Sequence, residues 1–342
     1  MKIAVIGAGA IGALVAGYLS KAGVDVALTA RSRDVSVIKE NGLIIEGVRG
    51  KMAVSVRVAD RLEKGADLVI IAVKTQDIAA TLSDNARALD GALVLAVQNG
   101  VRAEEILAEF VPREKIISSV VLFGVTYLEP GKVVHNFEGD WLMGKAFAPN
   151  DEEMERIGNV LSKAFSVRVA EDIRGMKWLK LFLNLNNCLP ALTGKSMQET
   201  FSHLGICGLS IRLLDEALQA VDRAGVELES LPDFPIDRLR GLTAMPLEKA
   251  SGIFSQTMTN LSKEPLYGSI LQSIKRGKPS EIDYFNGEIV CLGSKIWAAT
   301  PLNEKMVKMV HRVERGGEFS RPEEILSEVG GGKNATGFFP DR

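Results

Sequence analysis

The chain has 342 residues, more than the roughly 100–200 that form one domain, so we expect two domains. Its 41 basic and 43 acidic side chains nearly cancel, which excludes the global basic excess that binding to nucleic acid demands. Hydrophobic residues make up 46% and charged residues 25%, and these globular values exclude disorder along the whole chain. Cys188, Cys207 and Cys291 are scattered, with no C-x-x-C pair, so we expect neither a zinc site nor a disulfide framework.

The chain starts with a long uncharged stretch between Lys2 and Lys21, which resembles a signal peptide or a membrane anchor. The stretch is interrupted by Gly7, Gly9, Gly12 and Gly17. Because residues 2–6 are also short and β-branched, the pattern favours a strand, a turn and a helix over one apolar rod. Together with the free thiols, this predicts a cytoplasmic protein without a membrane segment.

A glycine-rich motif, G-A-G-A-I-G, follows the first predicted strand, residues 3–6, and opens a predicted helix that ends at Gly23. A second strand is predicted at 24–28. Glycines at this spacing permit a tight turn, close approach of the backbone to a pyrophosphate and close packing of helix on strand. We therefore predict a dinucleotide site that includes Gly7, Gly9, Ala10, Ile11 and Gly12.

The end of the second predicted strand indicates which nicotinamide cofactor fits. NAD sites usually carry an acid here, but the chain has T-A-R-S-R at 29–33, with Arg31 and Arg33 around Ser32. A guanidinium pairs well with a 2′-phosphate, so NADPH is the predicted cofactor. The alternative is that the two arginines only solvate a surface loop.

Two further predicted strands, 67–73 and 92–97, end in polar clusters. Lys74 belongs to the first cluster, K-T-Q, and Asn99 to the second, Q-N-G. Carboxyl ends of parallel strands form the ligand crevice of an open sheet, so both residues are candidates for the site. Strands at 116–121 and 125–138 predict an antiparallel addition to this sheet, with His135 in a structural role.

From about residue 154 the pattern changes: a helix is predicted up to residue 165, a short strand follows at 167–169, and long helical stretches come after it. We predict an α/β protein with an N-terminal Rossmann-type doubly wound sheet at 1–170 and an all-helical domain at 171–315. Residues 316–342 lack sustained periodicity, contain three consecutive glycines and are predicted to form a flexible tail.

Lys180 and Asn184 are four residues apart on a predicted helix at 175–184, so they share a face. In a crevice, they offer an ammonium donor and an amide that can orient a carbonyl. The alternative is an exposed lysine beside a capping amide.

A series of motifs, in this order, resembles the ketopantoate reductase (2-dehydropantoate 2-reductase) family over residues 1–312. They are G-A-G-A-I-G with Arg31, the strand ends V-K-T and Q-N-G, the helix W-L-K-L-F-L-N, A-L-T-G at 191–194 and S-E-I-D-Y-F-N-G at 280–287. The resemblance implies NADPH-dependent reduction of a 2-oxo acid to a 2-hydroxy acid. The implied substrate is ketopantoate, which is reduced to pantoate in pantothenate and coenzyme A biosynthesis.

The resemblance also implies roles for residues of the helical half. Lys180 corresponds to the family's general acid and Asn184 to its substrate-binding amide. Glu281 corresponds to the glutamate that holds the substrate, the cofactor and the lysine network, where its carboxylate would offset the effect of burial on the lysine pKa. Ser269 corresponds to the serine that binds the substrate carboxylate, whereas the role of Asp283 stays open.

In the cofactor half, Lys74 corresponds to the family's cofactor-binding lysine, and Asn99 to the asparagine beside nicotinamide and substrate. No metal is expected, because an ammonium already stands where the alkoxide would form.

Three positions depart from the family pattern. Cys188 replaces an asparagine for which Asn187 can substitute, Leu266 replaces another asparagine, and Asp77 replaces a glutamine. The precise 2-oxo acid therefore stays open. The alternatives are a β-hydroxyacid or opine-type dehydrogenase, or a non-catalytic NADP(H)-sensing protein, and a homodimer is the expected assembly.

Overall fold

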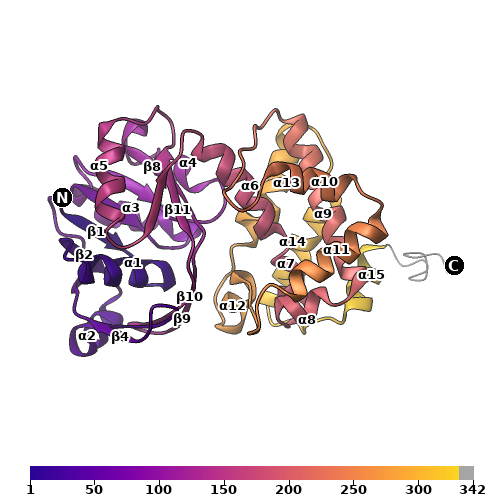
Figure 1. Cartoon of the computed structure of the whole chain (residues 1–342), viewed down its shortest axis with the longest axis horizontal. Helices are drawn as coiled ribbons and strands as arrows, with labels where there is room; N and C mark the ends of the chain where they lie inside the picture. The colour runs from indigo at the N-terminus through magenta and orange to yellow at the C-terminus, as the bar shows by residue number, and fades with distance from the viewer. Residues whose placement is uncertain (331–342) are drawn as a thin grey trace. The chain divides into compact units, whose positions relative to one another are not determined.

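The computed structural model describes residues 1–330, apart from the Arg87 side chain, and the chain divides into two compact units (Figure 1). The first unit is Met1–Lys177 and the second starts at Trp178. The division falls inside helix α6 (Ile173–Leu185), slightly beyond the boundary expected near residue 170.

The first unit alternates strands with helices. Its strands are β1 (Ile3–Ile6), β2 (Val26–Thr29), β3 (Leu43–Gly47), β4 (Met52–Val54), β5 (Arg57–Ala59), β6 (Leu68–Ile71), β7 (Leu93–Ala96), β8 (Ile116–Val121), β9 (Gly124–Glu129), β10 (Lys132–Phe137), β11 (Asp140–Lys145) and β12 (Ser166–Val169). Its helices are α1 (Ala10–Lys21), α2 (Ser32–Asn41), α3 (Ile78–Asn85), α4 (Ala103–Leu107) and α5 (Glu152–Leu161), with 3₁₀ turns η1 (Thr75–Asp77), η2 (Ala86–Ala88) and η3 (Arg113–Lys115).

The main sheet has eight strands in the order β12-β11-β8-β7-β6-β1-β2-β5. All strands from β8 to β5 pair in parallel, whereas β11 pairs antiparallel to β8. The chain reverses direction across the sheet at β1, which lies between β2 and β6, and such a switch point is where doubly wound sheets bind dinucleotides. The predicted α/β class is confirmed.

A second sheet of four strands has the order β4-β3-β10-β9. The β9–β10 hairpin was expected to extend the main sheet, and that prediction is wrong. β10 instead pairs in parallel with β3, with Val133 opposite Ile45, and the antiparallel strand added to the main sheet is β11. The pairing partner lies about ninety positions earlier in the chain, so local periodicity carries no signal of it.

Helix α1 lies between the two sheets, packing on β1 and β2 on one side and on β3, β4, β9 and β10 on the other. Gly17 permits this approach, because a Cβ atom there would lie 2.5 Å from the Ile45 side chain. Tyr18 on the same helix bonds through its hydroxyl to Nδ1 of buried His135, at 3.0 Å. His135 therefore joins α1 to the second sheet, in line with its expected structural role.

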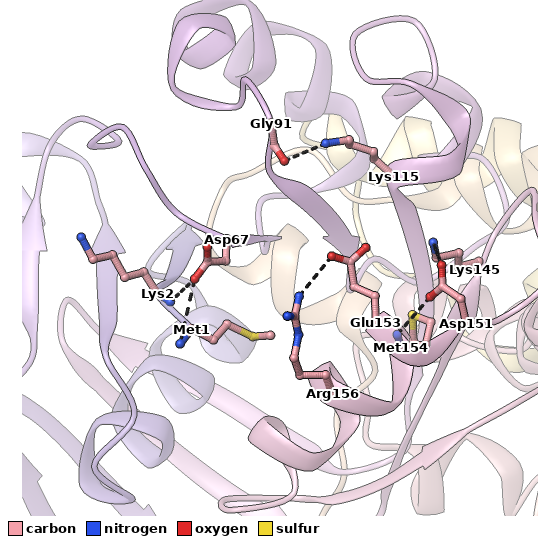
Figure 2. Close-up of polar contacts among 10 residues, drawn as sticks. All are labelled: Met1, Lys2, Asp67, Gly91, Lys115, Lys145, Asp151, Glu153, Met154 and Arg156. Carbon is pink, nitrogen blue, oxygen red and sulfur yellow. Dashed lines mark hydrogen bonds and ion pairs between the residues drawn. The ribbon is translucent and has the colours of Figure 1, made fainter.

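Polar contacts join the amino-terminal ends of neighbouring strands in the main sheet (Figure 2). The Lys2 backbone N–H donates to Asp67 Oδ2 at 2.7 Å, which links the residues before β1 and β6. Lys115 Nζ donates to the Gly91 carbonyl at 2.8 Å, which links the residues before β8 and β7. These hydrogen bonds lie at the amino-terminal edge of the sheet. The candidate cofactor residues lie at the opposite edge, at the carboxyl ends of the strands.

The described part of the second unit is helical, apart from one isolated bridge between Leu231 and Phe234. Its helices are the end of α6, α7 (Cys188–Thr193), α8 (Met197–Phe201), α9 (Leu204–Arg223), α10 (Ile236–Ala244), α11 (Leu247–Thr259), α12 (Ser269–Lys275), α13 (Asn286–Lys295), α14 (Pro301–Glu314) and α15 (Pro322–Val329), with the 3₁₀ turn η4 (Ile282–Tyr284). Among residues 1–330, no helix combines the length and the apolar character needed to cross a membrane.

A flexible tail was expected from residue 316, but residues 316–330 are packed on the second unit. Ser320 donates its backbone N–H to the Leu192 carbonyl at 2.8 Å, and α15 then packs on α9 with Ile325 fully buried. Pro322 at the first helical turn and Glu324, which bonds to the Arg321 backbone, start this helix. α15 has only eight residues, too few to give a sustained periodicity in the sequence before the glycines at 330–332. Residues 331–342 lie outside the described part.

Candidate active site

The glycine motif forms the turn between β1 and α1. Gly7 has φ +109°, a conformation that favours glycine, and a Cβ atom there would lie 2.9 Å from the Ala72 backbone. A Cβ atom on Gly12 would lie 1.9 Å from the Gly7 carbonyl oxygen. These two glycines are therefore required by packing between the turn, the helix and β6.

Gly9 differs from its neighbours, because nothing lies within 4 Å of a Cβ atom placed on it. It caps α1, and Ala10 and Ile11 follow in the first helical turn, which carries no acidic side chain. The first N–H groups of a helix have no partner within it, and the helix dipole favours an anion there. The turn thus fits a dinucleotide pyrophosphate, which would occupy the open space at Gly9.

Arg31 lies at the carboxyl end of β2 as the N-cap residue of α2, and its side chain is exposed. Arg33 is also exposed and contacts Asp34 at 3.3 Å. Sequence inspection missed one charged residue of this region, Asp60, whose carboxylate accepts a hydrogen bond from Ser32 Oγ at 3.4 Å. Asp60 follows the short strand β5, and only the pairing of β5 with β2 shows that it belongs here.

Lys74 and Asn99 follow β6 and β7, and both are half-buried. Gln98, beside Asn99, donates through Nε2 to the carbonyl oxygens of Ile71 and Val73 at 2.7 and 2.8 Å. This amide joins the ends of the two strands and fixes the segment that carries Asn99. The turn at Gly7 to Gly12, Arg31, Lys74 and Asn99 thus lie along one edge of one sheet, as expected.

Helix α6 carries the candidate general acid, Lys180. Leu179, Leu181 and Leu185 on this helix are buried, whereas Lys180 is half-buried. Burial lowers the pKa of Lys180 to about 8.

Two asparagines follow Lys180 around the junction of α6 and α7. Asn187 Nδ2 approaches Asn184 Oδ1 at 3.4 Å, so the carbonyl of Asn184 is engaged. The Nδ2 atom of Asn184 is buried and has no hydrogen-bond partner among the described residues. A buried amide donor without a partner is costly, and a ligand oxygen would satisfy it.

Ser269 begins α12 and is exposed. The preceding residue, Gly268, lies so close to Asn187 that a Cβ atom on it would be 2.5 Å from Asn187 Oδ1. The fold of the second unit therefore brings Asn187 and the start of α12 together, although more than eighty positions separate them in sequence.

Glu281 is half-buried and precedes η4. Two residues on, Asp283 contacts His311 Nε2 at 2.9 Å, and Glu314 contacts Nδ1 of the same ring at 2.8 Å. Burial would lower the pKa of His311, but these two carboxylates raise it above its ordinary value. The role of Asp283 was left open by the sequence. Its contact with His311 holds the S-E-I-D segment to α14.

Of the positions that depart from the family pattern, Cys188 is fully buried, and burial raises the pKa of its thiol to about 12. Such a thiol is a packing group and not a nucleophile. The backbone of Leu266 bonds to Gln198 and Met197, whereas Asp77 is exposed at the start of α3. Within residues 1–330, no three His, Cys, Asp or Glu side chains gather as metal ligands would.

Comparisons with known proteins agree along both units. The model of the family "Ketopantoate reductase PanE/ApbA" matches residues 3–146, and the model of its C-terminal part matches residues 172–314. The 2-dehydropantoate 2-reductase of Mesorhizobium japonicum is 30% identical over 92% of this chain and 99% of its own length. That of Pyrococcus abyssi is 29% identical over 89% of this chain and 94% of its own length.

Solved structures share the fold. A PanE/ApbA family ketopantoate reductase from Ralstonia eutropha has a TM-score of 0.78 at 28% identity, covering 92% of this chain and 99% of its own. A D-mandelate dehydrogenase solved with NADH and anilino(oxo)acetate has a TM-score of 0.80 at 23% identity, again over 92% and 99% of the two chains. The chain belongs to the ketopantoate reductase family.

Proposed function

We propose that this chain reduces a 2-oxo acid to a 2-hydroxy acid with NADPH, and that ketopantoate, reduced to pantoate for pantothenate and coenzyme A biosynthesis, is the substrate. Family membership supports the reaction class, and the observation that carries the proposal is the pair on α6, Lys180 and Asn184. The carbonyl carbon gains a hydride and its oxygen gains a proton, while NADPH becomes NADP⁺. When bound, the nicotinamide supplies that hydride.

Lys180 is the proposed proton donor. With its pKa at about 8, most of its amine is protonated at neutral pH, yet it gives up a proton more readily than an ordinary lysine. The same ammonium stabilises negative charge on the carbonyl oxygen as the alkoxide develops. One side chain thus supplies both the charge and the proton that ketone reduction needs.

The substrate is held, in this proposal, by amides and a hydroxyl. Asn184 donates its partnerless Nδ2–H to the substrate, and Asn187 fixes the Asn184 carbonyl so that this donor keeps its orientation. Ser269 donates to the substrate carboxylate, and Glu281 orients the substrate and the lysine. Each contact contributes only a modest net free energy of substrate binding. The orientation of the carbonyl toward the hydride therefore depends on several contacts together.

The cofactor is held by the first unit. The N–H groups at Gly9 to Gly12 bind the pyrophosphate, Arg31 binds the 2′-phosphate, and Lys74 and Asn99 contact the cofactor at the ends of β6 and β7. The open space at Gly9 and the exposed guanidinium of Arg31 support these assignments. We also propose that the protein acts in the cytoplasm and that it is a homodimer. Light scattering of the purified protein tests the dimer.

The experiment follows NADPH oxidation with a panel of 2-oxo acids that includes ketopantoate and phenylglyoxylate, and with pyruvate plus an amino acid. A separate assay follows NADP⁺ reduction with a β-hydroxyacid. We expect turnover of ketopantoate and a loss of about 10²–10⁴-fold in kcat for Lys180→Ala. The matched control is Lys163→Ala, which removes an exposed lysine of the first unit and leaves the rate unchanged.

Each alternative has its own result. Turnover of the β-hydroxyacid or of the amino acid mixture, without turnover of any 2-oxo acid, would replace the proposed reaction by a related dehydrogenase. NADPH binding without any turnover would identify a cofactor-sensing protein. Near-normal turnover by Lys180→Ala would refute the proton-donor role.

A further inference from the structure

An acidic side chain lies beside the predicted 2′-phosphate site, although the end of β2 has none. β2 and β5 are parallel neighbours, with Thr29 opposite Ala59, and the Ala30 N–H donates to the Ala59 carbonyl at 3.0 Å. The next residue on the β5 side is Asp60. Pairing of the two strands therefore brings a carboxylate to the same edge as Arg31.

The carboxylate of Asp60 is turned toward the start of α2. Its Oδ2 accepts from Ser32 Oγ at 3.4 Å, and both side chains are exposed. Ser32 directly follows Arg31, so the carboxylate contacts the residue next to the arginine that is proposed to bind the 2′-phosphate. Arg33 on the other side of Ser32 contacts Asp34, which already engages part of its charge.

The two cofactors meet this arrangement differently. The adenosine ribose of NADH offers hydroxyl donors that a carboxylate accepts, whereas NADPH carries a phosphate with a charge near −2 at the 2′ position. A carboxylate repels that phosphate while Arg31 attracts it. The charges therefore oppose each other at one site, and selectivity depends on their balance.

We infer that Asp60 is a specificity-determining residue that lowers the preference for NADPH over NADH set by Arg31. The inference rests on the proposed function, because it concerns the cofactor site of that reaction. The inference goes beyond the proposed function in two ways. It assigns a second residue, just after β5, that opposes Arg31, and it states that the wild-type chain also binds NADH.

The test measures the dissociation constants of NADPH and NADH for the full chain by titration of nicotinamide fluorescence at fixed ionic strength. Asp60→Asn removes the charge and keeps a hydrogen-bond acceptor, so NADPH binds about three- to tenfold tighter and NADH is nearly unchanged. Asp60→Ala removes both, so NADPH again tightens while NADH weakens about threefold.

The matched control is Asp25→Asn. Asp25 pairs with Arg57 at the opposite end of the same two strands, and its substitution changes the net charge equally. It leaves the ratio of the two constants as in wild type. Arg31→Ala shifts the ratio the opposite way, weakening NADPH more than NADH.

The outcomes separate this inference from the proposed function. If NADPH binds and turns over but the ratio in Asp60→Asn stays within twofold of wild type, or shifts equally in Asp25→Asn, the inference is wrong and the proposed function stands. If wild type binds neither cofactor, both are overturned. A shift confined to Asp60 variants supports the inference.

Discussion

Lys177 and Glu104 form an ion pair inside the first unit, with 4% and 6% of their surfaces exposed. Glu104 Oε1 also accepts from Ser118 Oγ at 2.7 Å, and the Ser118 side chain is fully buried. Lys177 lies one turn before Lys180 on α6. The pair therefore fixes the segment of α6 that precedes the proposed proton donor, and its charges are screened little by solvent.

Removing one member of this pair leaves the other charge buried without its partner. We predict that Glu104→Leu lowers the free energy of unfolding by about 3–5 kcal/mol, whereas adding Lys177→Met to it restores most of the loss. Urea denaturation measures both. Glu105→Leu, which removes the adjacent exposed carboxylate paired with Arg113, serves as control and costs below about 1 kcal/mol. A double variant as unstable as the single one would contradict this account.

The lowered pKa of Lys180 predicts how the reduction rate depends on pH. A general acid must carry its proton, so kcat/KM is constant below about pH 8 and falls as pH rises through the pKa. Well above it, the loss approaches tenfold per pH unit. Initial rates of NADPH oxidation from pH 6 to 10 measure this dependence. If kcat/KM does not change up to pH 10, the proton comes from another group.

The motif glycines Gly9 and Gly12 are predicted to differ in what they contribute. Gly12→Ala places a methyl group against the Gly7 carbonyl and destabilises the first unit, whereas Gly9→Ala enters open space and leaves the free energy of unfolding within about 0.5 kcal/mol. Gly9→Ala nevertheless weakens NADPH at least about tenfold, because the methyl group occupies the proposed pyrophosphate position. Denaturation and cofactor titration on both variants separate packing from binding.

Trp297 is, within residues 1–330, the non-glycine residue with positive φ, at +55°, and it is 91% exposed. It follows α13, and the next N–H, of Ala298, donates to the Gly293 carbonyl at 2.9 Å, a C-terminal motif that favours glycine at position 297. We predict that Trp297→Gly stabilises the protein by about 1 kcal/mol in thermal denaturation. Trp297→Ala keeps the strained backbone, so it brings no such gain; equal gains for both variants would remove the conformational explanation.

Much of the first unit could be predicted because its signals are local. Buried strands such as β1 and β7 are continuous apolar runs, and the turn at Gly7 to Gly12 has a spacing that its packing requires. Lys180 and Asn184 were found on one helix, where a four-residue spacing determines a shared face.

What could not be predicted depends on pairing between distant segments. Asp60 acquires its place from the register of β5 with β2, and Glu104 meets Lys177 across 73 positions of sequence. The second sheet forms because β10 pairs with β3, and three-residue strands such as β4 carry too little periodicity to be recognised. The pattern of charged and apolar residues along the sequence does not indicate which distant segments pair.

The contacts of residues 316–330 have a practical consequence for where the protein can be cut. The family model ends at residue 314, yet Phe319 packs on Gly194, Ser320 bonds to Leu192, and Leu326 of α15 lies against Gly205 of α9. A chain ended at the family boundary would uncover these buried surfaces on α7 and α9. The family boundary at residue 314 and the end of the packed helices therefore differ, and we expect expression of the second unit to need the chain at least to Gly330.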